Sequence, residues 1–307
     1  SRRRHTRSGR VTGVQTCALP ILERTFCGEG SCTAWLLTIG PTAGVDPESF
    51  IHSKFIIIWA CNSVSTNLHH WHIVKEAQKK GAKIIVIDAY ASRTAKEADW
   101  HICPKPGTDG ALAMAMMHVI IEEDLVDQDY IDQYTVGFPE LAALAKERTP
   151  EWAEATTGIS AQDIRKLARE YATTQPSAIR IGVALEKSWG GGQTIRAVTC
   201  LPALTGAWRH VGGGILQFPV WEQPYKFDVI CRPDLIPKGT QVVNNLQLGR
   251  VLTGEIELKV PIKSMMCWNT NPVTQSTESE KILEGLKRED LFLVSARSEE
   301  HTSELQS

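Results

Sequence analysis

The stretch FIIIWACNSVSTN, residues 55–67, decides how this chain folds, together with KIIVID at residues 83–88. Both begin with an apolar, β-branched run of strand length and without polar alternation, which is typical of a parallel strand covered by helices on both faces. Between them, residues 68–80 form an amphipathic helical stretch that ends at Gly81. The order strand, helix, strand is the repeating unit of an α/β fold.

The same alternation continues along the chain. It predicts an α/β fold with doubly wound, mostly parallel sheets in two Rossmann-like βα halves, with a long Pro-rich irregular crossover from residue 212 to about 260. Ser160 and Asp163 stand at capping-box spacing at the start of one helix. The further strands are expected at 178–183, 263–268 and 291–294, and the further helices at 111–123, 160–173, 190–204 and 277–287.

Ligands of open α/β sheets bind outside the carboxyl ends of the strands. The loops that follow the predicted strands are therefore the expected binding loops. They are residues 60–67, 88–94, 104–110, 184–193 and 268–275.

The two ends of the chain differ from its middle. Residues 1–21 hold five arginines without an acid, and with residues 297–307 they resemble translated sequencing-adaptor DNA. We therefore expect both ends to be non-native, residues 22–215 to form one α/β region, and residues 216–296 to hold the crossover and the start of the second half.

Composition excludes several classes of protein. Leaving out the two ends removes six of the 33 basic and three of the 35 acidic residues, so the net charge becomes about −5, which disfavours a nucleic-acid partner. No apolar run reaches about 18 residues, so direct membrane insertion is not expected. The eight cysteines form no CxxC pair, which argues against a disulfide framework and a self-contained zinc or iron–sulfur site.

Some polar residues at the strand exits suit a nucleotide, each with a plainer alternative. Asn62 to Asn67 lies at a helix start that could attract phosphate, or it is an ordinary capping turn. Asp88 could accept hydrogen bonds from a ribose diol or a guanine edge, with Arg93 neutralising a phosphate, or it is a solvated carboxylate at a strand end. The run GGGQ at 190–193 is either a phosphate cradle or a common glycine-rich helix entry.

Longer motifs carry a resemblance to a known family. The runs at 55–67, 83–120, TTGISAQDIRKLAREYA (156–172), GGGQTIRAVTC (190–200) and MMCWNTNPVTQS (265–276) are similar to the molybdopterin oxidoreductases, which include dimethyl sulfoxide reductase, formate dehydrogenases and periplasmic nitrate reductases. The resemblance implies molybdenum or tungsten held by two molybdopterin guanine dinucleotides, one of which the α/β region of residues 22–215 would bind.

The resemblance also implies roles for individual residues. Asn62 and Ser63 would lie against one pterin dinucleotide, and Asp88 and Arg93 near its guanosine. The residues implied to line the same nucleotide are Gly107, Thr108, Asp109, Gly192 and Gln193, and those implied to face the second dinucleotide are Asn269, Asn271 and Pro272.

Cys27 is the residue that the resemblance assigns to the metal. Relatives with a cysteine or selenocysteine ligand carry it shortly before this region, followed about thirteen residues later by glycine, and Cys27 and Gly40 have that spacing. A soft thiolate suits molybdenum that dithiolene sulfurs already bind. Cys32 is the competing ligand, and a buried structural cysteine is the alternative for Cys27.

The implied function is a two-electron oxidoreductase of formate dehydrogenase-like or nitrate reductase-like activity on a small molecule. Electrons would pass to a 4Fe-4S cluster in a preceding segment, with an iron–sulfur or membrane subunit as partner. The rival hypothesis is a cofactor-free structural or electron-transfer subunit of a respiratory complex with the same fold. The chain as written is expected to be a piece of the enzyme with little activity of its own, and its compartment is left open.

Overall fold

The structure is a computed structural model that describes residues 27–40, 44–217 and 226–296. The chain forms two compact units, one from Gly30 to Tyr225 and one made largely of the residues from Lys226 onward. The segments expected to be non-native, 1–21 and 297–307, lie outside the described residues. Among the helices of the described part, none has the length and apolar character needed to cross a bilayer.

The first unit is built on a five-stranded parallel sheet with the order β3-β2-β1-β4-β5. Chain order runs outward from β1 in one direction through β2 and β3, and in the other through β4 and β5, so the topology switches between β1 and β4. The strands are β1 (Phe55–Trp59), β2 (Lys83–Ile87), β3 (Trp100–Ile102), β4 (Ser177–Ile181) and β5 (Gly214–Leu216).

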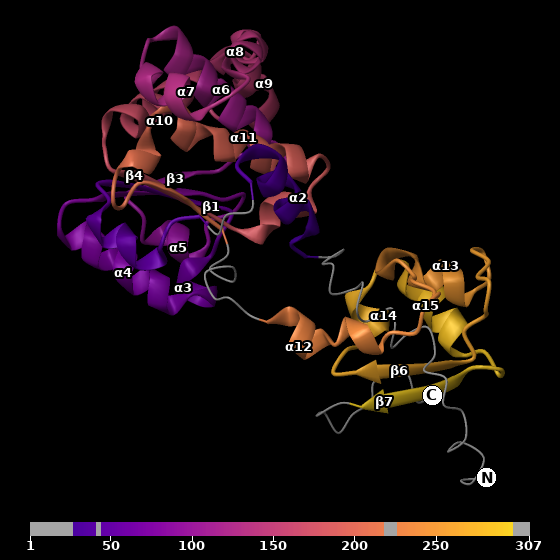
Figure 1. Ribbon diagram of the computed structural model, residues 1–307. Helices are drawn as coiled ribbons and strands as arrows, with labels where there is room; N and C mark the ends of the chain where they lie inside the picture. Colours follow the sequence, from indigo (N-terminus) through magenta and orange to yellow (C-terminus); the bar gives the residue numbers. More distant parts are fainter. Residues whose placement is uncertain (1–26, 41–43, 218–225, 297–307) are drawn as a thin grey trace. The chain divides into compact units, whose positions relative to one another are not determined.

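Helices cover both faces of this sheet, which confirms the predicted α/β class (Figure 1). Successive side chains of β1 point to opposite faces. Phe55, Ile57 and Trp59 pack with one set of helices, and Ile56 and Ile58 pack with the other. The first face carries α6 (Asp109–Glu122), α10 (Ala161–Thr173) and α11 (Gly191–Leu204), and the second carries α3 (Ser63–Thr66), α4 (Leu68–Lys79) and α5 (Arg93–Lys96).

Several elements were not expected from the sequence. The segment after α6 forms three short helices, and the region expected to be irregular from residue 212 begins with a strand, β5, that completes the sheet. The strand β3 holds only three residues, too few for a periodic signal. The unexpected helices of the first unit are the short α3 and α5, which overlap expected loops, and α2 (Glu29–Thr38), α7 (Gln128–Tyr134), α8 (Phe138–Lys146) and α9 (Pro150–Thr157), together with 3-10 turns at η1 (Pro47–His52), η2 (Val183–Lys187) and η3 (Ala207–Arg209).

The second unit contains a parallel strand pair joined by a helical crossover. Strands β6 (Ser264–Trp268) and β7 (Phe292–Ala296) pair in parallel, and α15 (Ser279–Leu286) lies between them in the chain. Met265, Cys267 and Ile282 lie in its core. The remaining elements are α12 (Phe227–Cys231), η5 (Pro233–Leu235), η6 (Asn245–Gln247), α13 (Leu248–Leu252) and α14 (Pro272–Gln275).

Gly182 allows the exits of β1 and β4 to touch where the topology switches. Its N–H donates to the Trp59 carbonyl at 2.8 Å, and Ala60 turns there with a φ of 51°. A Cβ on Gly182 would lie 1.8 Å from the Ala60 carbonyl oxygen, so this position accepts no side chain without a backbone shift.

Substituting Gly182→Ala is therefore expected to destabilise the chain by about 1–3 kcal/mol or more, because the backbone of one strand exit must move. Urea unfolding followed by circular dichroism measures the change. The control is Gly192→Ala in the first turn of α11, where a Cβ meets nothing closer than 3.7 Å. Equal stability of the two variants would contradict the role of Gly182.

Candidate functional site

A pocket of about 610 Å³ opens at the carboxyl edge of the sheet, beside the point where the topology switches. Its volume is in the range that binds small molecules and cofactors. Residues that follow β1, β2, β3, β4 and β5 all contribute to it. The lining includes Cys61, Asn62, Asp88, Tyr90, Gly107, Asp109, Arg180, Gly182, Lys187, Ser188 and Gln217.

Four of the five expected binding loops meet in this pocket. Each of the ranges 60–67, 88–94, 104–110 and 184–193 supplies lining residues, as the rule for open α/β sheets predicted. The fifth range, 268–275, belongs to the second unit. The convergence of segments far apart in the sequence makes this pocket the candidate site of the first unit.

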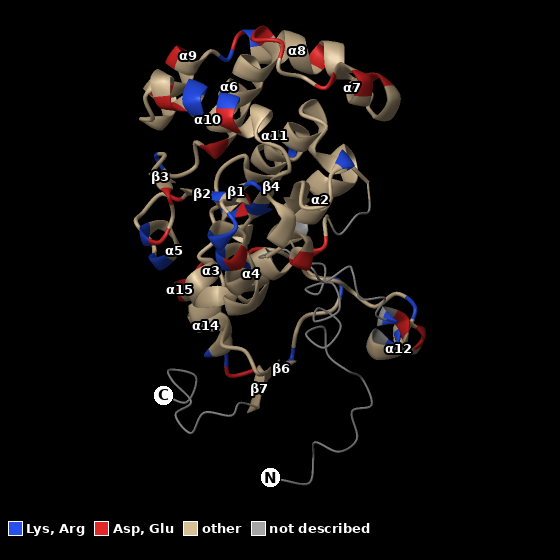
Figure 2. Cartoon of the chain, turned by 90° about the vertical axis from the view of Figure 1, so that its left-hand side faces the viewer, with Lys and Arg blue, Asp and Glu red and all other residues tan. Residues whose placement is uncertain are grey.

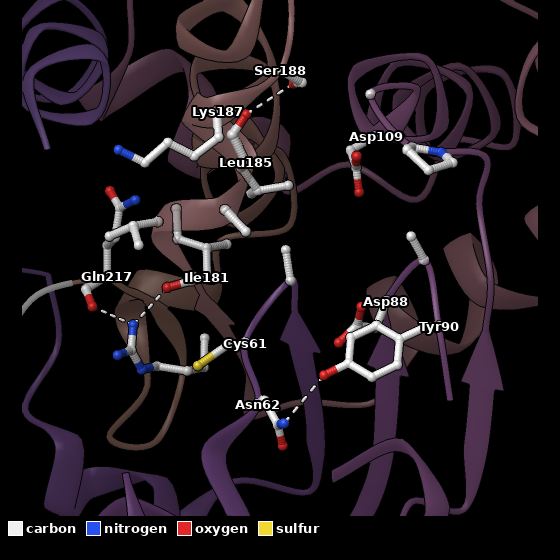
Figure 3. Close-up of a pocket in the computed structure, with 18 of the residues that line it drawn as sticks. Cys61, Asn62, Asp88, Tyr90, Asp109, Ile181, Leu185, Lys187, Ser188 and Gln217 are labelled. Carbon is white, nitrogen blue, oxygen red and sulfur yellow. Dashed lines mark hydrogen bonds between the residues drawn. The ribbon is translucent and has the colours of Figure 1, made fainter. Parts of the chain in front are cut away.

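Asn62, Asp88 and Tyr90 form one wall of the pocket (Figure 3). The Asn62 amide donates to the Tyr90 hydroxyl at 3.3 Å, and its Oδ1 accepts from the Thr94 hydroxyl at 2.9 Å. Asn62 makes no side-chain bond to the α3 backbone, whereas Asn67 caps α4 by accepting from the His70 N–H at 3.3 Å, so the capping alternative holds for Asn67 and not for Asn62. The Val64 N–H donates to the Thr94 hydroxyl, so this N–H is not available to bind a phosphate.

Asp109 faces the same part of the pocket from the first turn of α6 (Figure 3). The indole of the fully buried Trp59 donates to Asp109 Oδ1 at 2.8 Å. Burial raises the pKa of the Asp109 carboxyl, the Trp59 hydrogen bond lowers it, and the negative charge of Asp88 raises it further. The two carboxylates therefore form an acidic wall suited to a ligand that offers hydrogen-bond donors.

Lys187 and Gln217 lie on the other side of the pocket (Figure 3), and Arg180 also lines it. Arg180 is the penultimate residue of β4, and its Nη1 donates to the carbonyls of Ile181, at 2.6 Å, and Gln217. Lys187 Nζ lies 3.3 Å from a carboxylate oxygen of Glu186. This second set of residues forms a basic wall.

Behind the basic wall, a buried polar network ties three distant segments together. The Ser31 N–H and hydroxyl both donate to Glu186 Oε2, at 2.8 and 2.7 Å. The Gln217 amide donates to the Ser31 hydroxyl at 2.8 Å and accepts from the Trp35 indole at 2.7 Å. A carboxylate at the first turn of α2 also suits the partial positive charge there. This network, which we call the α2 latch, holds the start of α2 against η2 and the end of β5.

Five of the residues that the resemblance assigned to the first dinucleotide do not line this pocket. Ser63 is buried, with its hydroxyl 3.6 Å from Cys61 Sγ, and Arg93 is exposed at the start of α5. Thr108 donates its hydroxyl to the Lys105 carbonyl at 2.7 Å. Gly192 and Gln193 lie in the first turn of α11, where Gln193 is exposed and accepts from Arg196.

The three residues implied for a second dinucleotide stand together in the second unit. Asn269 follows β6 with a left-handed φ of 50°, and its N–H donates to the Ala296 carbonyl at 2.9 Å. Asn271 and Pro272 are buried at the start of α14. They occupy the carboxyl end of a parallel strand, as the pocket residues of the first unit do.

Cys27 is exposed and stands two residues before α2. Because it is exposed, the alternative of a buried structural cysteine is wrong for this residue. Cys32 is partly buried within α2. Cys61 and Cys267 are buried, Cys200 is partly buried and Cys103 is exposed.

Sequence reasoning missed Tyr90, Arg180, Lys187 and Gln217 as pocket residues. Arg180 carried a readable signal, because it is a charged residue inside an apolar strand that helices cover. Gln217 carried none, since it lies at the end of a strand that was itself not expected.

Comparison with known proteins adds to this geometry. The family model described as molybdopterin oxidoreductase matches residues 31–302 of the chain. "Probable oxidoreductase YoaE" of Bacillus subtilis is 43% identical over 274 residues, which cover 89% of this chain and 40% of that relative. The chain thus spans less than half the length of this relative.

Two further proteins are similar to this chain. Formate dehydrogenase H of Escherichia coli is 43% identical over 135 residues, which are 44% of this chain and 19% of that protein. Among solved structures, acetylene hydratase from Pelobacter acetylenicus matches with a TM-score of 0.72 at 24% identity, covering 87% of this chain and 41% of that one. The structural match supports the fold.

The raised pKa of Asp109 predicts a pH-dependent effect of Asp109→Asn. The folded carboxyl keeps its proton to a higher pH than the unfolded one, so the stability it contributes is present at low pH and is lost as the pH rises through the folded pKa. As the pH rises from about 4 to about 7, the free energy of unfolding of the variant should therefore increase relative to that of the wild type. Urea unfolding at both pH values measures this difference.

The control variant should show a change in stability with pH that is opposite in sign. A hydrogen bond from Arg169 lowers the pKa of Glu123, so Glu123→Gln should lose stability relative to the wild type as the pH rises over the same interval. If Asp109→Asn followed the same direction as Glu123→Gln, the inferred environment of Asp109 would be wrong.

The α2 latch predicts a strong effect of Glu186→Ala. The buried Ser31 N–H and hydroxyl would lose their acceptor, at a cost of about 1–3 kcal/mol in the free energy of unfolding. Glu186→Gln keeps an acceptor oxygen and should lose less. Both are measured by urea unfolding.

The matched surface control is Glu151→Ala, which removes an exposed pair with Arg165 among the mixed charges of the outer helices (Figure 2). Its effect should stay within about 0.5 kcal/mol. If Glu186→Ala lost no more than this control, the latch would not stabilise the fold.

Proposed function

The chain belongs to the molybdopterin oxidoreductase family, and on that premise we propose that it forms part of a catalytic subunit whose molybdenum or tungsten is held by two molybdopterin guanine dinucleotides. The observation that carries the proposal is the pocket of the first unit, where four predicted strand-exit loops converge. The metal centre, when bound, supplies two-electron redox chemistry.

The acidic wall fits the guanosine end of such a dinucleotide. Asp88 and Asp109 are adjacent carboxylates, and a ribose diol or a guanine edge offers the N–H and O–H donors that would relieve their mutual repulsion. Asn62 is already oriented by Thr94 and Tyr90, so its position is fixed before a ligand enters. Gly107 lines the same pocket with a φ of +80°, where a side chain would be strained.

We assign the second dinucleotide to the loop after β6. Asn269, Asn271 and Pro272 follow the carboxyl end of a parallel strand, which is where this class of sheet binds ligands. The other residues of the first half, Ser63, Arg93, Thr108, Gly192 and Gln193, stay assigned to the first dinucleotide by resemblance to the family alone.

Cys27 is the proposed thiolate ligand of the metal, with Cys32 as the competing residue. Cys27 is exposed in this chain, so its sulfur is accessible to a metal, whereas Cys32 is partly buried within a helix. The α2 latch fixes the first turn of the helix that Cys27 precedes. We therefore expect the latch to limit the motion of the chain that leads to the ligand.

The proposed reaction is the two-electron oxidation or reduction of a small molecule, of the formate dehydrogenase or nitrate reductase type. We place a 4Fe-4S cluster and an iron–sulfur or membrane subunit on the path of the electrons. Because the chain spans 40% of YoaE, the reaction and the partners belong to a whole protein that this chain represents in part.

The proposal predicts how two substitutions separate nucleotide binding from metal ligation. After anaerobic expression in a host that makes the cofactor, Asp88→Ala should weaken guanine dinucleotide retention by about 10- to 100-fold, because a charged hydrogen-bond acceptor is lost. Cys27→Ser should keep the dinucleotide but change the sulfur ligation seen by X-ray absorption at the metal. Nucleotide is measured by chromatography and metal by mass spectrometry.

The control is Asp129→Ala, which removes an exposed carboxylate that pairs with Arg209 outside the pocket and should change neither quantity. A wild-type protein that acquires neither guanine nucleotide nor metal would contradict the proposal and favour the cofactor-free subunit. An unchanged metal signature in Cys27→Ser, with a changed one in Cys32→Ser, would move the ligand to Cys32.

A further inference from the structure

Arg180 is a buried cation in the wall of the pocket. It lies inside the parallel strand β4 with 8% of its surface exposed, where helices cover both faces of the sheet. Its Nη1 donates to the carbonyls of Ile181, Leu216 and Gln217. Its Nε is buried and has no hydrogen-bond partner among the described residues.

The charge of Arg180 is not matched by a carboxylate within the described part of the chain. No ion pair joins it to an acid there, and burial lowers the pKa of its guanidinium. A guanidinium nevertheless stays protonated in proteins, so the positive charge persists in the wall. Carbonyl dipoles compensate it in part, and a buried charge without a counter-charge is costly.

The neighbouring His70 also experiences this charge. Burial and the charge of Arg180 lower the pKa of His70 to about 3, and both ring nitrogens lack hydrogen-bond partners among the described residues. His70 therefore stays neutral and adds no second positive charge beside Arg180. An anion that enters the pocket would supply one.

The acidic side chains of the pocket do not fill this role. The charge of Asp88 raises the pKa of Asp109, whereas no carboxylate of the described residues contributes to the pKa of Arg180. Figure 3 shows Asp88 and Asp109 across the pocket from Gln217, whose carbonyl Arg180 contacts. The two sides of the pocket thus differ in charge. The acidic wall suits hydrogen-bond donors of a ligand, and the basic wall suits an anion.

We propose that Arg180 binds an oxyanion in this pocket, with Lys187 contributing positive charge from the same wall. This inference rests on the proposed function, because the oxyanion has two sources there, a phosphate of the dinucleotide or a small oxyanion substrate. A planar guanidinium recognises the oxygens of either one through paired N–H donors.

The experiment measures stabilisation of the purified 307-residue chain by added anions. Inorganic pyrophosphate, guanosine diphosphate and formate are titrated separately, and the shift in Tm with concentration gives each affinity. Arg180→Gln keeps donors for the strand-end carbonyls but removes the charge, and it should weaken oxyanion affinity by about 10- to 100-fold. Arg180→Lys should restore part of it. Arg196→Gln, outside this pocket, should bind as the wild type does.

The quantity compared between variants is the increase in Tm on adding ligand. The Tm without ligand is not compared, because Arg180→Gln is also expected to lower it by weakening three carbonyl contacts. Stabilisation by pyrophosphate and guanosine diphosphate, lost in Arg180→Gln, supports the inference and assigns the anion to the nucleotide. Stabilisation by formate alone, lost in the same variant, supports it and assigns the anion to a substrate.

Two results would overturn the inference. One is a wild-type chain that no anion stabilises, and the other is an Arg180→Gln variant that binds these anions as the wild type does. If the variant binds normally while Asp88→Ala loses the guanine dinucleotide, Arg180 is excluded and the proposed function stands. If the chain acquires no dinucleotide but pyrophosphate binding still depends on Arg180, the oxyanion site stands without the proposed function.

Discussion

The hydrogen bond from the Gly182 N–H to the Trp59 carbonyl joins the exits of β1 and β4, and the site of the first unit depends on it. These two strands are neighbours in the sheet, but the chain leaves them toward opposite sides. A crevice between their exits needs both backbones to pass close by without a side chain between them. The absence of a Cβ at Gly182 and the left-handed turn at Ala60 meet that requirement.

From that contact, the site acquires two chemically different walls. Asp109 lies at the start of α6 and is held by Trp59, whose ring belongs to the core. Arg180 lies inside β4 and is held by carbonyls at the ends of β4 and β5. Because both walls are anchored in the sheet and its first helices, the polarity of the pocket is a property of the fold rather than of mobile surface side chains.

The sequence was informative wherever the signal was local. The runs at 55–59 and 83–88 predicted β1 and β2 closely, and Ser160 does accept a hydrogen bond from the Asp163 N–H at the start of α10. The carboxyl-edge rule then selected four loops that do line one pocket. The fold class and the position of the first site could therefore be predicted from residues close together in the chain.

What the sequence could not predict depends on partners far apart in it. β5 is a strand of only three residues, directly after a pair of glycines, and it becomes a strand only because it pairs with β4. The short strand β3 depends on its pairing with β2 in the same way. The role of Arg180 follows from carbonyls up to 37 residues away.

The α2 latch has a consequence for the order in which the protein is made. Ser31 leaves the ribosome 186 residues before its partner Gln217, which at about 5–20 residues per second is a delay of roughly 10 to 40 s. Ser31 gains its first latch partner when Glu186 has been made, whereas the Trp35 indole gains its acceptor only with Gln217. The helix that Cys27 precedes is thus synthesised well before the residues that secure it, so the chain next to the proposed ligand becomes fixed only after β5 has been made.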